Sequence, residues 1–125
     1  MKIATWNVNS MKVRLPHVME WMQANEPDVL VLQEIKQVTE AFPAAELLEA
    51  GYQSLANGQK TYNGVAVISK TAPADPVLEF PGFDDPQRRV LATTIDGVRV
   101  VNLYIPNGSE VGSEKYDYKL RWLAT

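Results

Sequence analysis

The stretch that decides the fold is VLVLQEIK, residues 29–36. Its four apolar residues run without a break, which predicts a β-strand covered on both faces, as in a parallel sheet. A strand is also predicted at residues 2–8, and apolar residues at helical spacing lie between the two strands. Strand, helix and strand at this spacing form a βαβ unit, so we expect the two strands to run parallel with a right-handed crossover.

The helix between these strands has recognisable ends. We place Pro16 in its first turn, where a missing N–H costs no hydrogen bond. The string Asn25-Glu26-Pro27 ends it, because a residue that precedes proline is kept out of the helical conformation. Its apolar residues, which we assign to the core, are Met11, Leu15, Val18, Met19 and Met22.

The rest of the chain alternates short strands with turns. A short helix is predicted at 42–50 with Gly51 as its C-cap, Asp96-Gly97 predicts a two-residue hairpin, and Asn57-Gly58 is interpreted as a simple turn. Strands are predicted at 52–55, 64–69, 77–80, 90–95 and 98–105, and a last helix at 114–125. Together these elements predict an α/β fold: one mixed sheet of about seven strands with helices on one face.

Composition narrows the class of protein only slightly. The 125 residues suffice for one domain with a core, and no apolar run reaches membrane-spanning length, so no membrane partner is expected. The net charge of −3, from 12 basic and 15 acidic residues, neither indicates nor excludes nucleic acid. The absence of cysteine excludes disulfides and thiolate chemistry, and it leads us to expect a cytoplasmic protein.

Polar side chains stand where the first two predicted strands end. Asn7 lies at the end of the first strand and Glu34 at the end of the second. If the two strands are parallel neighbours, these side chains lie side by side. Ligands bind at the carboxyl ends of strands in open α/β sheets, which is where these residues stand. A carboxylate beside an amide oxygen suits Mg²⁺. Two simpler alternatives stay open here: Glu34 as a residue that merely ends a strand at solvent, and Asn7 as a turn or cap residue.

The string VNLYIPNG, residues 101–108, adds a third strand end with polar groups. Tyr104 and Asn107 follow a strongly apolar strand there, and a hydroxyl with an amide can hold a phosphate or a developing oxyanion. A core aromatic residue and an Asn-Gly turn are the structural alternatives. Polar groups at the ends of three strands favour a functional site.

Five strings connect the chain to a known family. They are WNVNS (6–10), LQEIK (32–36), YNGVAVIS (62–69), QRRV (87–90) and VNLYIPNG (101–108). With them, the chain resembles the N-terminal half of the exonuclease III and AP endonuclease family, in the endonuclease/exonuclease/phosphatase superfamily. The resemblance implies half of a four-layer α/β sandwich, to which this chain would give one helix layer and one mixed sheet. The other sheet face would then be apolar and need the missing C-terminal half or a second copy.

The resemblance also implies roles for individual residues. Glu34 is similar to a magnesium ligand of the family, with manganese as a possible substitute, and Asn7 to the asparagine beside the metal and the scissile phosphate. Tyr104 resembles a tyrosine that contacts the phosphate, and Asn107 an amide that positions it. DNA contacts are implied for Asn9, Lys36, Tyr62, Asn63, Arg88 and Arg89. For Lys36 and the two arginines, structural ion pairing is an equal alternative.

The implied activity is magnesium-dependent hydrolysis of double-stranded DNA at abasic sites and 3′ ends by the intact protein. The family's Gly-Asp-x-Asn string and its late aspartate–histidine pair do not occur, and the only histidine, His17, is expected on the surface of the first helix. We therefore expect the 125-residue chain alone to be inactive. The alternatives are a half-domain that at most binds metal or DNA weakly, and a relative that hydrolyses a small phosphoester.

Overall fold

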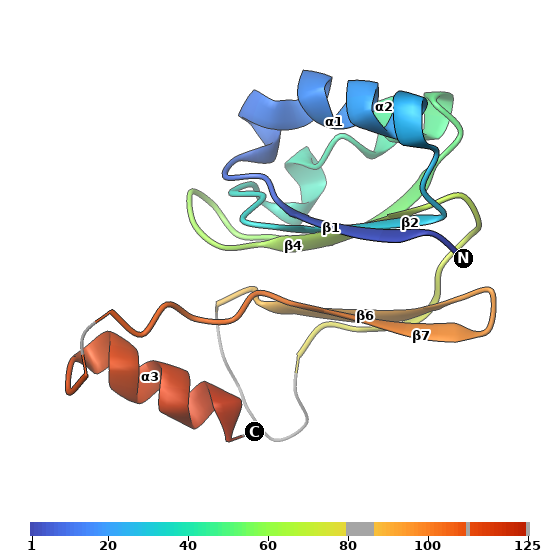
Figure 1. Ribbon diagram of the computed structural model, residues 1–125. Helices are drawn as coiled ribbons and strands as arrows, with labels where there is room; N and C mark the ends of the chain where they lie inside the picture. Colours follow the sequence, from blue (N-terminus) through green and yellow to red (C-terminus); the bar gives the residue numbers. More distant parts are fainter. Residues whose placement is uncertain (80–86, 110, 125) are drawn as a thin grey trace.

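The computed structural model describes residues 1–79, 87–109 and 111–124, and its elements form three main layers (Figure 1). The helices α1 (Met11–Asn25) and α2 (Ala44–Glu49) cover one face of a four-stranded sheet, and a three-stranded sheet covers the other. The first sheet contains, in spatial order, β1 (Ile3–Asn7), β2 (Val29–Gln33), β4 (Val65–Ser69) and β3 (Gln53–Asn57). The second contains β5 (Ala74–Val77), β6 (Val90–Ile95) and β7 (Val98–Leu103); a 3₁₀ turn, η1 (Thr39–Ala41), and α3 (Glu114–Leu123) complete the elements.

The α/β fold and the βαβ unit are confirmed, but the single sheet is wrong. β1 and β2 run parallel from Ile3 beside Val29 to Asn7 beside Gln33, and β4 runs antiparallel to both β2 and β3. The later strands do not join this mixed sheet. β6 and β7 pair through the Asp96-Gly97 hairpin, β5 adds to β6, and this second sheet lies against the first.

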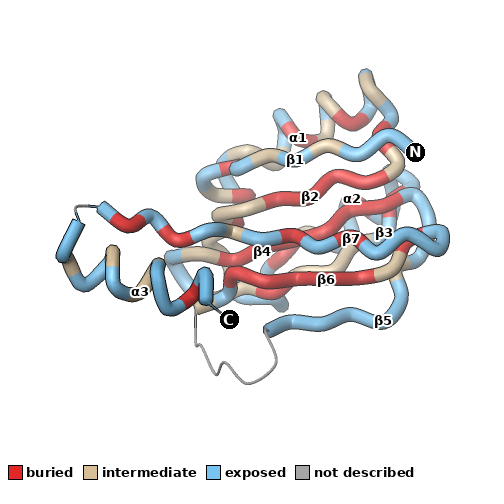
Figure 2. The backbone as a smooth tube through the Cα atoms, turned by 60° about the horizontal axis from the view of Figure 1, so that its bottom comes forward, coloured by how far each residue is buried: buried red, intermediate tan, exposed pale blue. Residues whose placement is uncertain are grey.

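The strand β2 explains why VLVL is apolar throughout. Leu30 and Leu32 pack into the core beneath the helices, whereas Val29 and Val31 pack into a second core that includes Leu91 of β6. Figure 2 shows β2, β4 and β6 as mainly buried strands. Both faces of β2 are therefore covered within this chain, as a parallel strand of this composition requires.

The apolar face that was expected to need a partner is covered by the chain's own second sheet. This corrects the prediction of one helix layer and one sheet, because the strands after β4 fold back onto the open face. Exposed apolar side chains gather instead on β7, a strand that is drawn mostly pale blue in Figure 2. They are Val98, Val101 and Leu103, and Val101 is 56% exposed.

The helix α1 begins earlier than predicted. Ser10 is its N-cap and accepts a hydrogen bond from the Val13 N–H at 3.4 Å, so Pro16 lies inside the helix and not in its first turn. The C-terminal end is as predicted: Glu26 adopts φ +46° and donates its N–H to the Met22 carbonyl before Pro27. His17 is exposed, as expected.

Two further local predictions need correction. β5 spans Ala74–Val77, not 77–80, and residue 80 lies outside the described residues. Asn57 is not merely a turn residue, because it ends β3, is buried, and donates through Nδ2 to the carbonyls of Leu78 at 2.9 Å and Val90 at 2.8 Å. Asn57 thereby ties the first sheet to the chain of the second. Within the described ranges, no helix is both long and apolar enough to cross a membrane.

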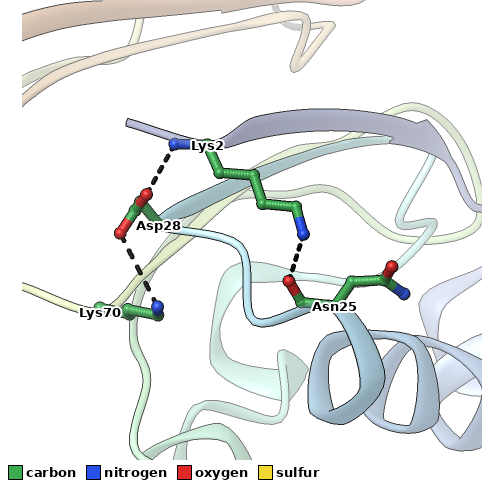
Figure 3. A network of polar contacts seen from close by, with 4 residues as sticks. All are labelled: Lys2, Asn25, Asp28 and Lys70. Carbon is green, nitrogen blue, oxygen red and sulfur yellow. Dashed lines mark hydrogen bonds and ion pairs between the residues drawn. The ribbon is translucent and has the colours of Figure 1, made fainter.

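A polar network lies where β1 and β2 begin, at the opposite end of these strands from Asn7 and Glu34 (Figure 3). Asp28 accepts a hydrogen bond from the Lys2 backbone N–H at 2.6 Å and lies 3.8 Å from the Lys70 ammonium. The Lys2 side chain donates to the carbonyl of Asn25 at the end of α1. The backbone hydrogen bond, followed by the nearby positive charges, lowers the pKa of Asp28 below its ordinary value of 3.8.

We predict that Asp28→Asn causes a small loss of stability at neutral pH that disappears in acid. A carboxyl whose pKa is lowered by folding stabilises the protein above its unfolded pKa and loses that effect as pH falls through the folded value. Thermal unfolding of the two proteins should therefore differ at pH 7 and converge below pH 3.8. A difference that persisted unchanged at low pH would contradict this account of Asp28.

Candidate active site

The strand ends of β1 and β2 bring Asn7 and Glu34 together, as the sequence predicted. Asn7 lies beside Gln33 in the parallel ladder, and its Nδ2 donates to Glu34 Oε2. Asn7 Oδ1 in turn accepts from the backbone N–H of Asn9 at 3.2 Å. The amide therefore orients the carboxylate, while its own oxygen is held by the following turn.

The backbone leaves the extended conformation at Glu34. The carboxylate therefore follows β2 and does not belong to its buried run. Glu34 has φ +58° and Lys36 has φ +56°, values that residues other than glycine rarely adopt. Two hydrogen bonds from the turn before α1 hold this segment: Ser10 N–H to the Glu34 carbonyl at 2.8 Å, and Met11 N–H to the Ile35 carbonyl at 3.0 Å. Backbone strain held in this way is typical of functional sites.

The predicted DNA-contacting residues Asn9 and Lys36 form a pair beside the carboxylate. Lys36 Nζ donates to Asn9 Oδ1 at 2.6 Å, and the Lys36 N–H donates to the Asn63 carbonyl at 3.0 Å. The partner of the Lys36 ammonium is thus an amide, not a carboxylate. This arrangement keeps a positive charge at the rim of the site.

Tyr104 reaches the same site from the end of β7. Its pKa is raised, first by burial and then by the neighbouring Glu34 carboxylate, which also accepts its hydrogen bond, while Arg89 opposes the shift. The phenol is therefore protonated at neutral pH and acts as a hydrogen-bond donor. Asn7, Glu34 and Tyr104 form a cluster of one carboxylate, one amide and one hydroxyl.

The two arginines of the QRRV string have different surroundings. Arg88 is exposed, whereas Arg89 is only 9% exposed and its guanidinium lies 4.6 Å from the ring centre of Tyr104 and 5.5 Å from that of Tyr118. Arg89 also donates from Nη1 to the Tyr104 carbonyl at 3.1 Å. Arg89 thus fastens Tyr104 to α3, a contact that sequence reasoning did not foresee.

A cavity of about 460 Å³ opens between the strand ends and α3. Three of its side chains are cationic and one is a carboxylate, so the cavity favours an anion. The residues around it are Gln87, Arg89, Tyr104, Pro106, Asn107, Glu114, Lys115, Tyr118 and Arg121. Asn107 thus lies on the cavity wall, with Oδ1 accepting from the Ser109 N–H at 2.9 Å. Lys115 and Arg121 were missed, because on a surface helix nothing distinguishes them from solvated charges.

The loop before β4 forms another part of the rim. Tyr62 is 68% exposed, an unusual position for a large aromatic side chain. Asn63 Nδ2 donates to Gln59 Oε1 at 3.1 Å, and the same oxygen accepts from the Arg88 N–H at 2.8 Å. The structure therefore places Tyr62, Asn63 and Arg88 close together in one loop cluster, and their roles stay predictions.

The chemistry of the cluster fits a hard cation. Carboxylate, amide and hydroxyl oxygens are the donors that Mg²⁺ accepts, and this ion commonly uses one or two carboxylates with water and substrate phosphates. The described part of the chain contains no group of three or more His, Cys, Asp or Glu side chains able to hold a metal. Glu34 is accordingly the one charged ligand that this cluster offers.

These features define an α/β sandwich protein with an oxygen-rich, anion-favouring site at its strand ends. The chain belongs to the endonuclease/exonuclease/phosphatase family, whose sequence model matches residues 4–125. This confirms the superfamily that the five strings indicated.

Three relatives illustrate the similarity. A 3′-5′ exonuclease from Neisseria meningitidis is 52% identical with a TM-score of 0.97, and the match covers 99% of this chain and 49% of that one. An AP endonuclease from Archaeoglobus fulgidus is 40% identical with a TM-score of 0.96, covering 99% and 48%. Exodeoxyribonuclease III from Haemophilus influenzae is 34% identical, covering 99% of this chain and 49% of its own length.

The chain thus spans about half the length of the relatives it matches. A further structure of the Neisseria protein, described there as a 3′ phosphatase, contains a product DNA hairpin.

The contrast between the two arginines gives a direct test. We predict that Arg89→Lys lowers the free energy of unfolding by about 1–2 kcal/mol, because lysine lacks the planar group that lies against two tyrosine rings. Arg88→Lys, on the exposed neighbour, should change it by less than about 0.5 kcal/mol. Urea denaturation of both variants measures the difference, and equal effects would refute the proposed stack.

Proposed function

We propose that the intact protein is a magnesium-dependent DNA repair nuclease that hydrolyses phosphodiesters. The observation that carries the proposal is the cluster of Asn7, Glu34 and Tyr104 beside a cavity with cationic walls. DNA as the substrate is supported by the relatives, which include exonucleases and an AP endonuclease. A site that carries one carboxylate and several cations suits a phosphate diester together with a metal ion.

Each residue of the cluster has a distinct task in this proposal. Glu34 holds the cation, and Asn7 keeps the carboxylate in place through its side-chain hydrogen bond. A bound Mg²⁺ would supply positive charge to stabilise the phosphate in the transition state. Tyr104, protonated at neutral pH, turns its one hydrogen bond from Glu34 to a phosphate oxygen when the substrate binds, and the Asn107 amide helps to orient the phosphate.

The substrate is proposed to be double-stranded DNA with an abasic site or a free 3′ end. Lys36 and Arg88 contact backbone phosphates, whereas the exposed Tyr62 ring offers a surface for a base or sugar. Asn9 and Asn63 support these contacts from the same loops. Both kinds of DNA site are proposed because the relatives include a 3′-5′ exonuclease and an AP endonuclease.

Residues 1–125 are proposed to be the N-terminal half of the catalytic domain. The relatives are about twice as long, and the group that activates the attacking water is proposed to come from their second half. Exposed apolar side chains on β7 and the exposed edge strand β1 support a partner there, either that half or a second copy. A cytoplasmic location remains a prediction from the cysteine-free sequence.

The test uses an end-labelled duplex that contains one abasic site, with magnesium or with EDTA. We expect no product from the 125-residue chain, and magnesium-dependent incision when the chain is joined to the second half of the Neisseria relative. Glu34→Gln in the joined protein should abolish incision because it removes the charged ligand. Glu40→Gln, on the exposed η1 turn, is the matched control and should cut normally.

Each alternative gives a different pattern in this assay. Incision by the chain alone would show that the water-activating group is supplied in some other way, for example by dimerisation. A joined protein that cuts inositol phosphate but not DNA would identify a small phosphoester as the substrate. A joined protein that is folded yet inactive on both would favour a half-domain that only binds metal or DNA.

A second prediction isolates the Tyr104 hydroxyl. In the joined protein, Tyr104→Phe should lower kcat on DNA by about 100-fold, because one preorganised donor to the phosphate is lost. The ring remains, so its contact with Arg89 and the fold are retained. Tyr52→Phe, a buried tyrosine next to β3, should leave kcat unchanged. Equal rates for Tyr104→Phe and the unaltered protein would remove Tyr104 from the mechanism.

A further inference from the structure

A buried amide connects the two sheets directly beneath the candidate site. Asn102 of β7 is 1% exposed, and its Nδ2 donates to the carbonyls of Leu32 and Ala66, both at 2.9 Å. Its Oδ1 accepts from Gln33 Nε2 at 2.9 Å. One side chain of the second sheet thus bonds to two strands of the first, and both ends of its amide are used.

This amide belongs to a chain of polar groups that crosses three strands. Gln33 Nε2 also donates to Thr5 Oγ1 at 3.0 Å, so the bonds lead from β1 through β2 to β7. This polar chain precedes the site in the sequence of each strand, because Thr5 comes before Asn7, Gln33 before Glu34, and Asn102 of β7 before Tyr104, which follows that strand. It is therefore a second polar layer under the first.

The remaining contacts between the sheets are mainly apolar. Val31, Val67, Leu91 and Val100 are among the residues that fill the space between them. Apolar packing is not directional, so it stabilises the two sheets together without strongly fixing how far one slides along the other. Hydrogen bonds from one amide to two defined carbonyls do fix that position, since a shift leaves buried groups unpaired.

We propose that Asn102 is a positioning residue, which sets β7 against β2 so that the Tyr104 hydroxyl meets the Glu34 carboxylate. Glu34 follows β2 of the first sheet and Tyr104 follows β7 of the second. Their contact therefore depends on how the sheets are docked. The importance of this contact for catalysis rests on the proposed function, but the positioning itself does not.

A matched control exists in Asn57. It is also a buried amide that bonds through Nδ2 to two carbonyls across the sheets, but its acceptors are Leu78 and Val90, not β2. Asn57→Leu and Asn102→Leu should therefore both lower thermal stability, since each leaves two carbonyls without their side-chain donor: those of Leu78 and Val90, or those of Leu32 and Ala66. Only Asn102→Leu should disturb the site.

The experiment is NMR spectroscopy of the 125-residue chain and both variants. We expect the nuclear Overhauser contact between the Tyr104 ring and the Glu34 side chain to be present in the unaltered chain and in Asn57→Leu, and to be lost in folded Asn102→Leu. If Asn102→Leu does not fold, Asn102→Ser replaces it, because the serine hydroxyl can make part of the hydrogen bonds that the amide makes. Retention of the contact in the folded Asn102 variant, or its loss in both variants alike, would overturn the proposal.

A separate arm tests the function on which the catalytic meaning rests. Magnesium chloride is added to the unaltered chain, and shifts of the Asn7 and Glu34 resonances are followed. Shifts confined to these residues support the proposed metal site. We expect the shifts to be absent from Glu34→Gln. Their absence counts against the metal site, whereas the positioning by Asn102 is decided by the Tyr104–Glu34 contact alone.

Discussion

The docking of the second sheet onto β2 is the constraint on which the rest of the structure depends. It buries Val29 and Val31, whose apolar character would otherwise leave an open face on the first sheet. It also brings the end of β7 over the end of β2, so that Tyr104 reaches Glu34. A single packing event therefore completes the core and assembles the site, and the stability of one is linked to the geometry of the other.

Local strain at the site is held by neighbouring loops. Glu34 and Lys36 adopt left-handed backbone conformations, and hydrogen bonds from the turn before α1 and from the loop before β4 fix the segment between them. Gly64 N–H donates to the Arg88 carbonyl, and Tyr104 N–H to the Arg89 carbonyl, so the same ladder continues to the second sheet. The functional side chains thus stand on backbone that is bonded from strand to strand, as a preorganised site requires.

The sequence predicted local features well and long-range ones less well. VLVLQEIK predicted a buried parallel strand followed by the Glu34 carboxylate beside Asn7, because periodicity and strand-end chemistry are both local signals. The division into two sheets was missed, because strand runs do not say which strands pair. Asn57 was misjudged for the same reason, because an Asn-Gly pair looks like a turn until its distant partners are known. The contacts of Arg89 with Tyr104 and Tyr118 were not foreseen either, since they also join distant parts of the chain.

The two cores explain how a site can be formed by a chain half as long as its relatives. Both apolar clusters, one under the helices and one between the sheets, are filled by residues of this chain. The groups proposed to bind metal and phosphate lie over these cores, so their positions need no outside support. The group that would activate water is a different matter, because the only histidine of the sequence is exposed on α1, a helix on the face of the first sheet opposite the second sheet. In the proposed function, phosphate binding and water activation are therefore separate tasks, and a second half would add the latter to a cluster that this chain already assembles.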